Sequence, residues 1–123
     1  MIYGIGCDIE AVSRFEGIKE NEKLISRLFT KKEREYIFLK KNYAQTAAGI
    51  FCAKESILKA MGTGMSGYSF LDFEIIHTEK GAPKVNILSK DAFFKCAKIL
   101  ISISHESEKA MATAIIELKE EVL

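Results

Sequence analysis

The stretch from Ala44 to Met61 is the feature that most constrains the fold. It contains no proline, and its apolar residues recur at helical spacing. The stripe consists of Ala47, Phe51, Leu58 and Met61, with Ala48, Cys52 and Ile57 beside it. Gly62 and Gly64 follow, and glycine readily adopts the positive φ that ends a helix. The pattern predicts one long helix with a buried face that other elements must cover.

The segments on either side of this helix differ in periodicity. Before it we expect a strand at 1–9, a short helix capped by Ser13, and helices near 21–28 and 31–40, the last starting at the capping-box pair Thr30 and Glu33. After it we expect strands at 70–78, 84–88, 99–104 and 110–118, a turn at 79–83 and a short helix at 91–98. Helices in the first half and strands in the second predict an α+β fold, with an antiparallel sheet and helices packed on one side. With 123 residues and no linker, we expect a single small domain, residues 1–123.

The composition narrows the class of protein. An apolar content of 48% with 28% charged residues is typical of a soluble globular protein. The apolar runs are too short to cross a bilayer and no targeting segment opens the chain, so we expect a cytoplasmic protein without a membrane partner. A net charge of +1 argues against a nucleic-acid partner. Cys7, Cys52 and Cys96 form no C-x-x-C pair, and we expect three buried apolar side chains.

Basic residues are concentrated between Lys19 and Lys41, with Arg14 just before them. Five glutamates are interspersed among them. The segment is therefore either a solvated helical face or a docking surface for an acidic protein.

Two acids and two lysines can be interpreted in two ways. Glu55 and Lys59 are four residues apart, the spacing of a surface pair that stabilises a helix by about 0.2–0.5 kcal/mol. Asp8 can be an ordinary turn residue after a strand. Alternatively, Asp8 and Glu55 hold Mg²⁺, which proteins bind through one or two carboxylates and the phosphates of the substrate. Lys54 and Lys59 would then neutralise phosphate oxygens.

The glycines and histidines are less specific. The turn Gly62-Thr63-Gly64 either only caps the helix or also lets a ligand approach the backbone. No Walker A loop occurs, and Gly4-Ile5-Gly6 lacks the third glycine of a dinucleotide fingerprint. His105 follows a strand and is either a phosphate ligand, a proton shuttle or a structural residue.

Three segments taken together resemble the holo-[acyl-carrier-protein] synthase family, the short bacterial type of 4′-phosphopantetheinyl transferase. They are Gly4-Ile5-Gly6-x-Asp8, then Phe51-x-Ala53-Lys54-Glu55-Ser56-x-x-Lys59-Ala60-x-Gly62-Thr63-Gly64, and Ser102-Ile103-Ser104-His105. The resemblance covers essentially the whole chain, including its length and the Gly81-x-Pro83 turn.

This resemblance implies the fold of that family and a transferase activity in fatty acid biosynthesis, part of lipid metabolism. The 4′-phosphopantetheine arm of coenzyme A would move to a serine of apo acyl carrier protein, releasing adenosine 3′,5′-bisphosphate. By analogy Asp8 and Glu55 hold Mg²⁺, and Lys59 stabilises or protonates the leaving phosphate. Glu55 or a metal-bound water are the candidates for the general base.

The resemblance also implies ligand and partner contacts. The coenzyme A site would include Lys54, Gly62, Thr63, Gly64, Pro83 and His105, with the Gly81–Pro83 turn near the adenine. Short members of the family look like homotrimers with active sites between subunits. Arg14, Lys23 and Arg27 would face the acidic carrier protein. The chain departs from some relatives at Ile50, where they carry an arginine before the motif phenylalanine, so a phosphate contact is missing or is made by another residue.

Two alternatives to an enzyme stay open from sequence. One is a coenzyme A- or nucleotide-binding module that keeps the pocket without turnover. The other is a structural trimer without a ligand, which leaves Asp8, Glu55 and Lys59 without a shared purpose.

Overall fold

The computed structural model describes residues 1–62 and 67–119. Its helices and strands are β1 (Ile2–Ala11), α1 (Glu22–Leu28), α2 (Lys31–Phe38), α3 (Tyr43–Met61), β2 (Phe73–His77), β3 (Pro83–Ile87), β4 (Ala97–His105) and β5 (Lys109–Leu118). Short 3-10 turns occupy Val12–Phe15, Ile18–Glu20, Phe70–Asp72 and Ala92–Cys96. None of the described helices is long and apolar enough to cross a membrane.

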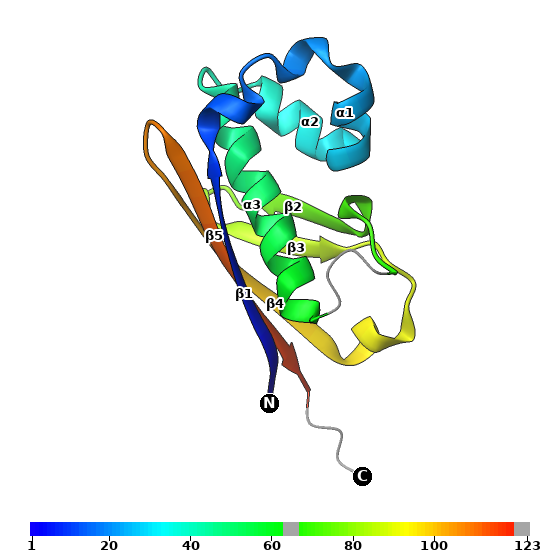
Figure 1. Cartoon of the computed structure of the whole chain (residues 1–123). Coiled ribbons are helices and arrows are strands. Elements are labelled where there is room, and N and C mark those ends of the chain that lie inside the picture. The colour runs from blue at the N-terminus through cyan, green and yellow to red at the C-terminus, as the bar shows by residue number, and fades with distance from the viewer. Residues whose placement is uncertain (63–66, 120–123) are drawn as a thin grey trace.

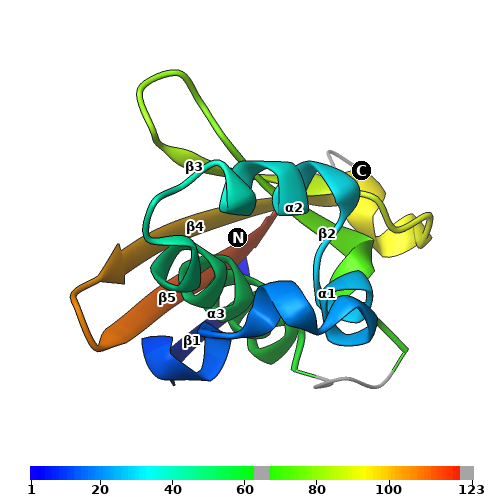
Figure 2. The same ribbon diagram turned by 90° about the horizontal axis from the view of Figure 1, so that it is seen from above.

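The strands form two antiparallel sheets around α3. The first has the order β1-β5-β4, and the second is the β2-β3 hairpin. The long helix runs along the first sheet, while α1 and α2 lie together at one end of the molecule (Figure 1). Seen from above, α2 and the β2-β3 hairpin lie on the β4 side of α3, and β1 lies on the other side (Figure 2). The α+β class with antiparallel strands is confirmed.

The face of the first sheet that supports α3 is built from small residues. On β5, Ala110, Ala112 and Ala114 are buried. On β1, a Cβ added to Gly6 would lie only 2.1 Å from the carbonyl oxygen of Ser56, and one on Gly4 only 2.0 Å from that of Ala60. Only glycine permits such a close approach of two backbones. The Gly4-Ile5-Gly6 segment therefore seats α3 directly against β1.

Two predicted helix boundaries are confirmed. The long helix ends at Gly62, which has φ +80° and donates its backbone N–H to the carbonyl of Lys59. The capping box of Thr30 and Glu33 starts α2, with both reciprocal hydrogen bonds formed.

Three local expectations are wrong. Ser13 caps no helix, because Ala11 is the residue preceding the first 3-10 turn, which has no side-chain cap. The segment 91–98 contains a 3-10 turn capped by Asp91, and β4 already begins at Ala97. Cys7 is exposed, because alternation along β1 turns it away from α3.

Candidate active site

Asp8, Glu55 and Lys59 converge where β1 meets α3. Alternation along the strand puts Asp8 on the same face as Gly4 and Gly6, toward the helix. Lys59 Nζ lies 3.1 Å from Asp8 Oδ1 and also donates to the carbonyl of Cys7 at 3.0 Å. The lysine of the predicted Glu55–Lys59 surface pair therefore binds Asp8 across the helix–strand contact.

The negative charge of Asp8 affects the protonation of Glu55. Burial, followed by the negative charge of Asp8, raises the pKa of Glu55, while the charges of Lys59 and Arg14 act in the opposite direction. The hydrogen bond with Asp8 is the main reason that the pKa of Lys59 is raised. Lys59 therefore stays protonated at neutral pH next to two carboxylates.

One oxygen of Asp8 has no partner among the described residues. The side chain is only 10% exposed, and Oδ2 is buried without a hydrogen bond to any residue of the described ranges 1–62 and 67–119. An unpaired buried carboxylate oxygen is costly and is suited to receive a cation. Within those same ranges no three His, Cys, Asp or Glu side chains form a group that could hold a metal ion.

Glu10 is a third acid at this site that the sequence interpretation did not include. Burial, then the closeness and negative charge of the Asp8 carboxylate, raises the pKa of Glu10, and the charge of Arg14 opposes the rise. Glu10 forms an ion pair with Arg14. Its position two residues after Asp8, on the same face of β1, is the signal that would have identified it.

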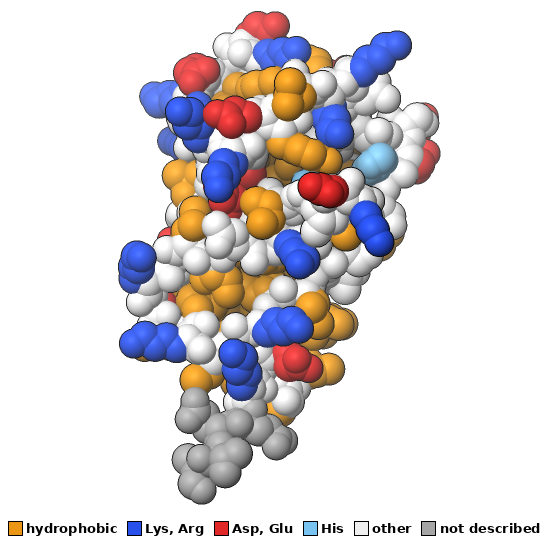
Figure 3. Space-filling view, turned by 180° about the vertical axis from the view of Figure 1, so that it is seen from behind, with side chains coloured by type: hydrophobic (Ala, Val, Ile, Leu, Met, Phe, Trp, Pro, Cys, Tyr) orange, Lys and Arg blue, Asp and Glu red, His pale blue; other side chains and the backbone are white. Residues whose placement is uncertain are grey.

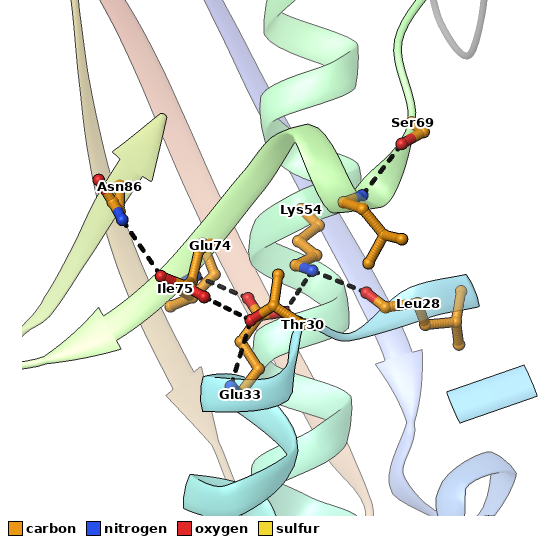
Figure 4. Close-up of polar contacts among 9 residues, drawn as sticks. Leu28, Thr30, Glu33, Lys54, Ser69, Glu74, Ile75 and Asn86 are labelled. Atoms are coloured by element: carbon orange, nitrogen blue, oxygen red, sulfur yellow. Dashed lines mark hydrogen bonds and ion pairs between the residues drawn. The ribbon is translucent and has the colours of Figure 1, made fainter. Parts of the chain in front are cut away.

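The position of Lys54 argues against the predicted contact of this lysine with phosphate. Its side chain has no exposed surface and forms an ion pair with Glu33, which is equally buried. Its Nζ also donates to the carbonyl of Leu28 at 2.7 Å. Figure 4 shows this lysine pointing toward Glu33 of α2 and the carbonyl of Leu28, the last residue of α1. A side chain held in this way makes no phosphate contact.

Glu33 joins three elements at the same point (Figure 4). One carboxylate oxygen accepts from the backbone N–H of Thr30 at 2.8 Å, and the other accepts from that of Ile75 on β2 at 2.6 Å. Glu74 continues the network by accepting from the Thr30 hydroxyl at 2.6 Å and from Asn86 at 3.1 Å. We call these residues, with Lys54, the buried polar network.

Several residues predicted for the coenzyme A site come together elsewhere. Gly81, Pro83 and His105 line one cavity of about 160 Å³ between α2, α3, the β2-β3 hairpin and β4. Ile50 lines it as well. Asp8 and His105 lie on the two edge strands of the β1-β5-β4 sheet, so this cavity and the carboxylates belong to different edges. Gly62 ends α3, while Thr63 and Gly64 lie outside the described residues.

The three basic residues predicted to contact a partner come from two elements. Lys23 and Arg27 are exposed on α1. Arg14 precedes it in a 3-10 turn, with its guanidinium 5.7 Å from the ring centroid of Phe51. Its ion pair with Glu10 brings Arg14 to the border of the carboxylate cluster.

Comparison with known proteins gives one consistent result. The holo-[acyl-carrier-protein] synthase of Clostridium botulinum (strain Eklund 17B / Type B) is 44% identical over 96% of this chain and 99% of its own length. That of Caldanaerobacter subterraneus subsp. tengcongensis is also 44% identical, over 90% of this chain and 91% of its own.

Solved structures agree with the sequence comparison. The holo-(acyl-carrier-protein) synthase of Bacillus anthracis str. Ames, in complex with CoA (3′,5′-ADP), has a TM-score of 0.83 and 34% identity, covering 97% of this chain and 99% of that one. The Helicobacter pylori enzyme in complex with coenzyme A has a TM-score of 0.79 and 31% identity, covering 92% and 99%. Residues 4–114, which include Asp8, Glu55 and Lys59, match the sequence profile of the 4′-phosphopantetheinyl transferase superfamily, and the chain belongs to that superfamily.

Proposed function

We propose that this chain is a holo-[acyl-carrier-protein] synthase. It transfers the 4′-phosphopantetheine arm of coenzyme A to a serine of apo acyl carrier protein and releases adenosine 3′,5′-bisphosphate. The observation that carries the proposal is the convergence of Asp8, Glu55 and Lys59 at the β1–α3 contact in a chain of this superfamily. A role in fatty acid biosynthesis and a cytoplasmic location stay predictions.

The acids of the site fit Mg²⁺. Asp8 has a buried oxygen without a partner in the described part of the chain, and the negative charge of Asp8 raises the pKa of Glu55. Mg²⁺ needs few protein ligands because the phosphates of a substrate complete its coordination. Asp8 and Glu55 are its proposed ligands, and Glu10 is close enough to Asp8 to support them. When bound, the ion would neutralise charge on the diphosphate.

Lys59 and Glu55 have separate proposed roles in the transfer. The serine oxygen attacks the β-phosphorus, the bond from that phosphorus to the bridging oxygen breaks, and the 5′-phosphate of the nucleotide leaves. Lys59, protonated and with a side chain 51% exposed, stabilises the departing oxygen. Glu55, with its raised pKa, is the proposed acceptor of the serine proton.

The carrier protein would approach the basic residues of the first half of the chain. Arg27 and Lys23 on α1 are exposed, and an acidic partner gains on-rate from opposed charges. Arg27→Glu is expected to raise the KM for carrier protein about fivefold and to leave the KM for coenzyme A unchanged, because a rim charge acts mainly on encounter. Arg14→Glu is a poorer test, since its ion pair with Glu10 ties it to the carboxylates.

A homotrimer with active sites between subunits is part of the proposal. The outer face of the first sheet carries exposed apolar side chains, including Ile5 (66% exposed), Ile9 (63%) and Met111 (45%). Such a patch is typical of an interface. On the side of the molecule seen in Figure 3, apolar side chains are exposed between lysines and arginines. The carboxylates and the cavity lined by Gly81, Pro83 and His105 belong to different edges of the sheet. Association would let one subunit supply the carboxylates and its neighbour the cavity. Sedimentation equilibrium tests this assembly.

Mass spectrometry of the carrier protein tests the function. The chain is incubated with apo acyl carrier protein, coenzyme A and Mg²⁺, and a carrier mass increased by one phosphopantetheinyl group is expected. The matched control omits Mg²⁺ and adds a chelator, and it should give no product. Coenzyme A binding without any mass gain would favour the binding module instead.

A further inference from the structure

The ion pair of Glu10 and Arg14 joins the carboxylate cluster to the basic residues predicted to contact a partner. Glu10 is near the end of β1, two residues after Asp8, and Arg14 lies in the 3-10 turn that follows. In Figure 1 this turn lies at the end of β1 that is close to α1 and α2. Nη1 of Arg14 donates to Oε1 of Glu10. The pair therefore spans the border between the two regions.

The two members of the pair differ in exposure. The side chain of Glu10 is 14% exposed, whereas that of Arg14 is 59% exposed. Glu10 is held on β1 next to Asp8, and it extends little into solvent. Glu10 is thus the fixed member of the pair, and Arg14 reaches from it toward solvent.

Two aromatic rings also contact the guanidinium of Arg14. Its Cζ lies 5.9 Å from the ring centroid of Phe15 and 5.7 Å from that of Phe51. Both phenylalanines are buried in the core, and their ring centroids are 5.4 Å apart. An arginine beside aromatic rings gains a cation–π attraction. The carboxylate of Glu10 and the two rings together restrict the position of the guanidinium.

Most of the hydrogen-bonding capacity of Arg14 is unused. A guanidinium has five N–H donors in a planar fork that matches a carboxylate. Within residues 1–62 and 67–119, Arg14 donates only to Glu10. Its other donors are available to a carboxylate of an acidic partner. A guanidinium that is already held in place loses less conformational freedom when this carboxylate binds.

We infer that Glu10 is a positioning residue, which holds Arg14 against Phe15 and Phe51 so that its free donors meet a carboxylate of the acidic carrier protein. This inference rests on the proposed function. Charge alone predicts the opposite effect, because removal of an acid strengthens the attraction between the chain and an acidic partner. The sign of the change in affinity therefore distinguishes positioning from simple charge.

Calorimetric titration with apo acyl carrier protein tests the inference. Glu10→Ala should raise the Kd about fivefold, the size expected when one long side chain must be ordered on binding. Glu10→Gln keeps a hydrogen-bond acceptor of similar shape and should raise it less. Glu16→Ala is the matched control, since Glu16 is exposed and forms no ion pair with any described residue, and it should not raise the Kd. Thermal melting of each variant checks that the fold is retained.

A double-mutant cycle separates positioning from other effects of Glu10. In an Arg14→Gln background, Glu10→Ala should leave the Kd unchanged, because no guanidinium remains to be positioned. A lower Kd for Glu10→Ala, or the same rise in both backgrounds, would overturn the inference while the proposed function stands.

Nuclear magnetic resonance relaxation of the Arg14 Nε–H group tests the positioning without a partner. This group should be ordered on the picosecond-to-nanosecond scale in the wild type and mobile in Glu10→Ala. Equal mobility in both proteins would overturn the inference. A wild-type chain with an ordered Arg14 that does not bind the carrier protein would instead overturn the proposed docking of that partner.

Discussion

Two lysines of the same helix have opposite surroundings. Lys54 is fully buried, and the buried polar network satisfies its ammonium with Glu33 and a backbone carbonyl. Lys59 is half exposed and faces Asp8, and one oxygen of Asp8 has no partner within residues 1–62 and 67–119. A saturated buried pair fixes structure, whereas a partly satisfied pair at the surface can exchange its partner for a ligand. The comparison places Lys54 in the fold and supports the proposed role of Lys59 in the chemistry.

The strongest test of the comparison is at the carboxylate cluster. Glu55→Gln should reduce phosphopantetheinyl transfer by about 10³-fold, because it removes both a proposed cation ligand and the proposed proton acceptor. The unfolding midpoint in urea should stay near that of the wild type. Glu35→Gln, an exposed acid on α2, is the matched control and should keep full activity. Full activity of Glu55→Gln would remove Glu55 from the proposed site.

Lys54→Met should have the converse effect. Breaking a buried ion pair leaves Glu33 as an uncompensated charge and should lower the free energy of unfolding by about 3–5 kcal/mol. The double variant Lys54→Met/Glu33→Gln should recover part of this loss, because residue 33 then carries no unpaired buried charge. Lys59→Met should change the unfolding free energy by less than about 1 kcal/mol, since its own side chain is half exposed, while reducing activity. A stable, inactive Lys54→Met would place Lys54 in the chemistry and break the comparison.

The smallest effect concerns Glu74 at the edge of the network. Burial by itself would raise its pKa, but hydrogen bonds from Thr30 and Asn86 and the charges of Lys32 and Lys54 outweigh it, so its pKa is lowered. A lowered pKa means that the unfolded chain binds the proton first. The stabilisation is therefore present above the usual glutamate pKa and is lost as the pH falls through the folded value.

Urea unfolding between pH 3 and 7 measures this effect. Glu74→Gln should show a weaker loss of stability on acidification than the wild type, a difference of about 1 kcal/mol or less at the low end, the order of one hydrogen bond. Identical pH profiles would remove Glu74 from the acid-sensitive part of the network.

The local elements were largely predictable. Helix 44–61 and its Gly62 stop, the Thr30–Glu33 capping box and the late strands follow from spacing and capping residues, which act within a few positions along the chain. The 3-10 turn at Ala92–Cys96 was taken for part of a longer helix, because a short apolar segment carries no signal that separates the two.

The candidate site was predictable only in part. Asp8, Glu55 and Lys59 were named from the motifs of a known family, and spacing alone left Glu55 and Lys59 as a surface pair. Glu10 was missed although strand alternation puts it beside Asp8. Lys54 was assigned to phosphate because its neighbours in sequence include Glu55 and Lys59, while its partner Glu33 lies far away in the chain.

The sequence by itself determined the helices, the strands, their α+β order and the residue types that chemistry at phosphate requires, because these depend on short-range periodicity and on motifs. Only the tertiary structure decided which charged groups meet. Gly4 and Gly6 let β1 approach α3 closely enough for Asp8 to reach Lys59, and α2 with β2 covers Lys54. Burial and partner choice depend on contacts between distant segments, so two lysines five residues apart on one helix take different roles.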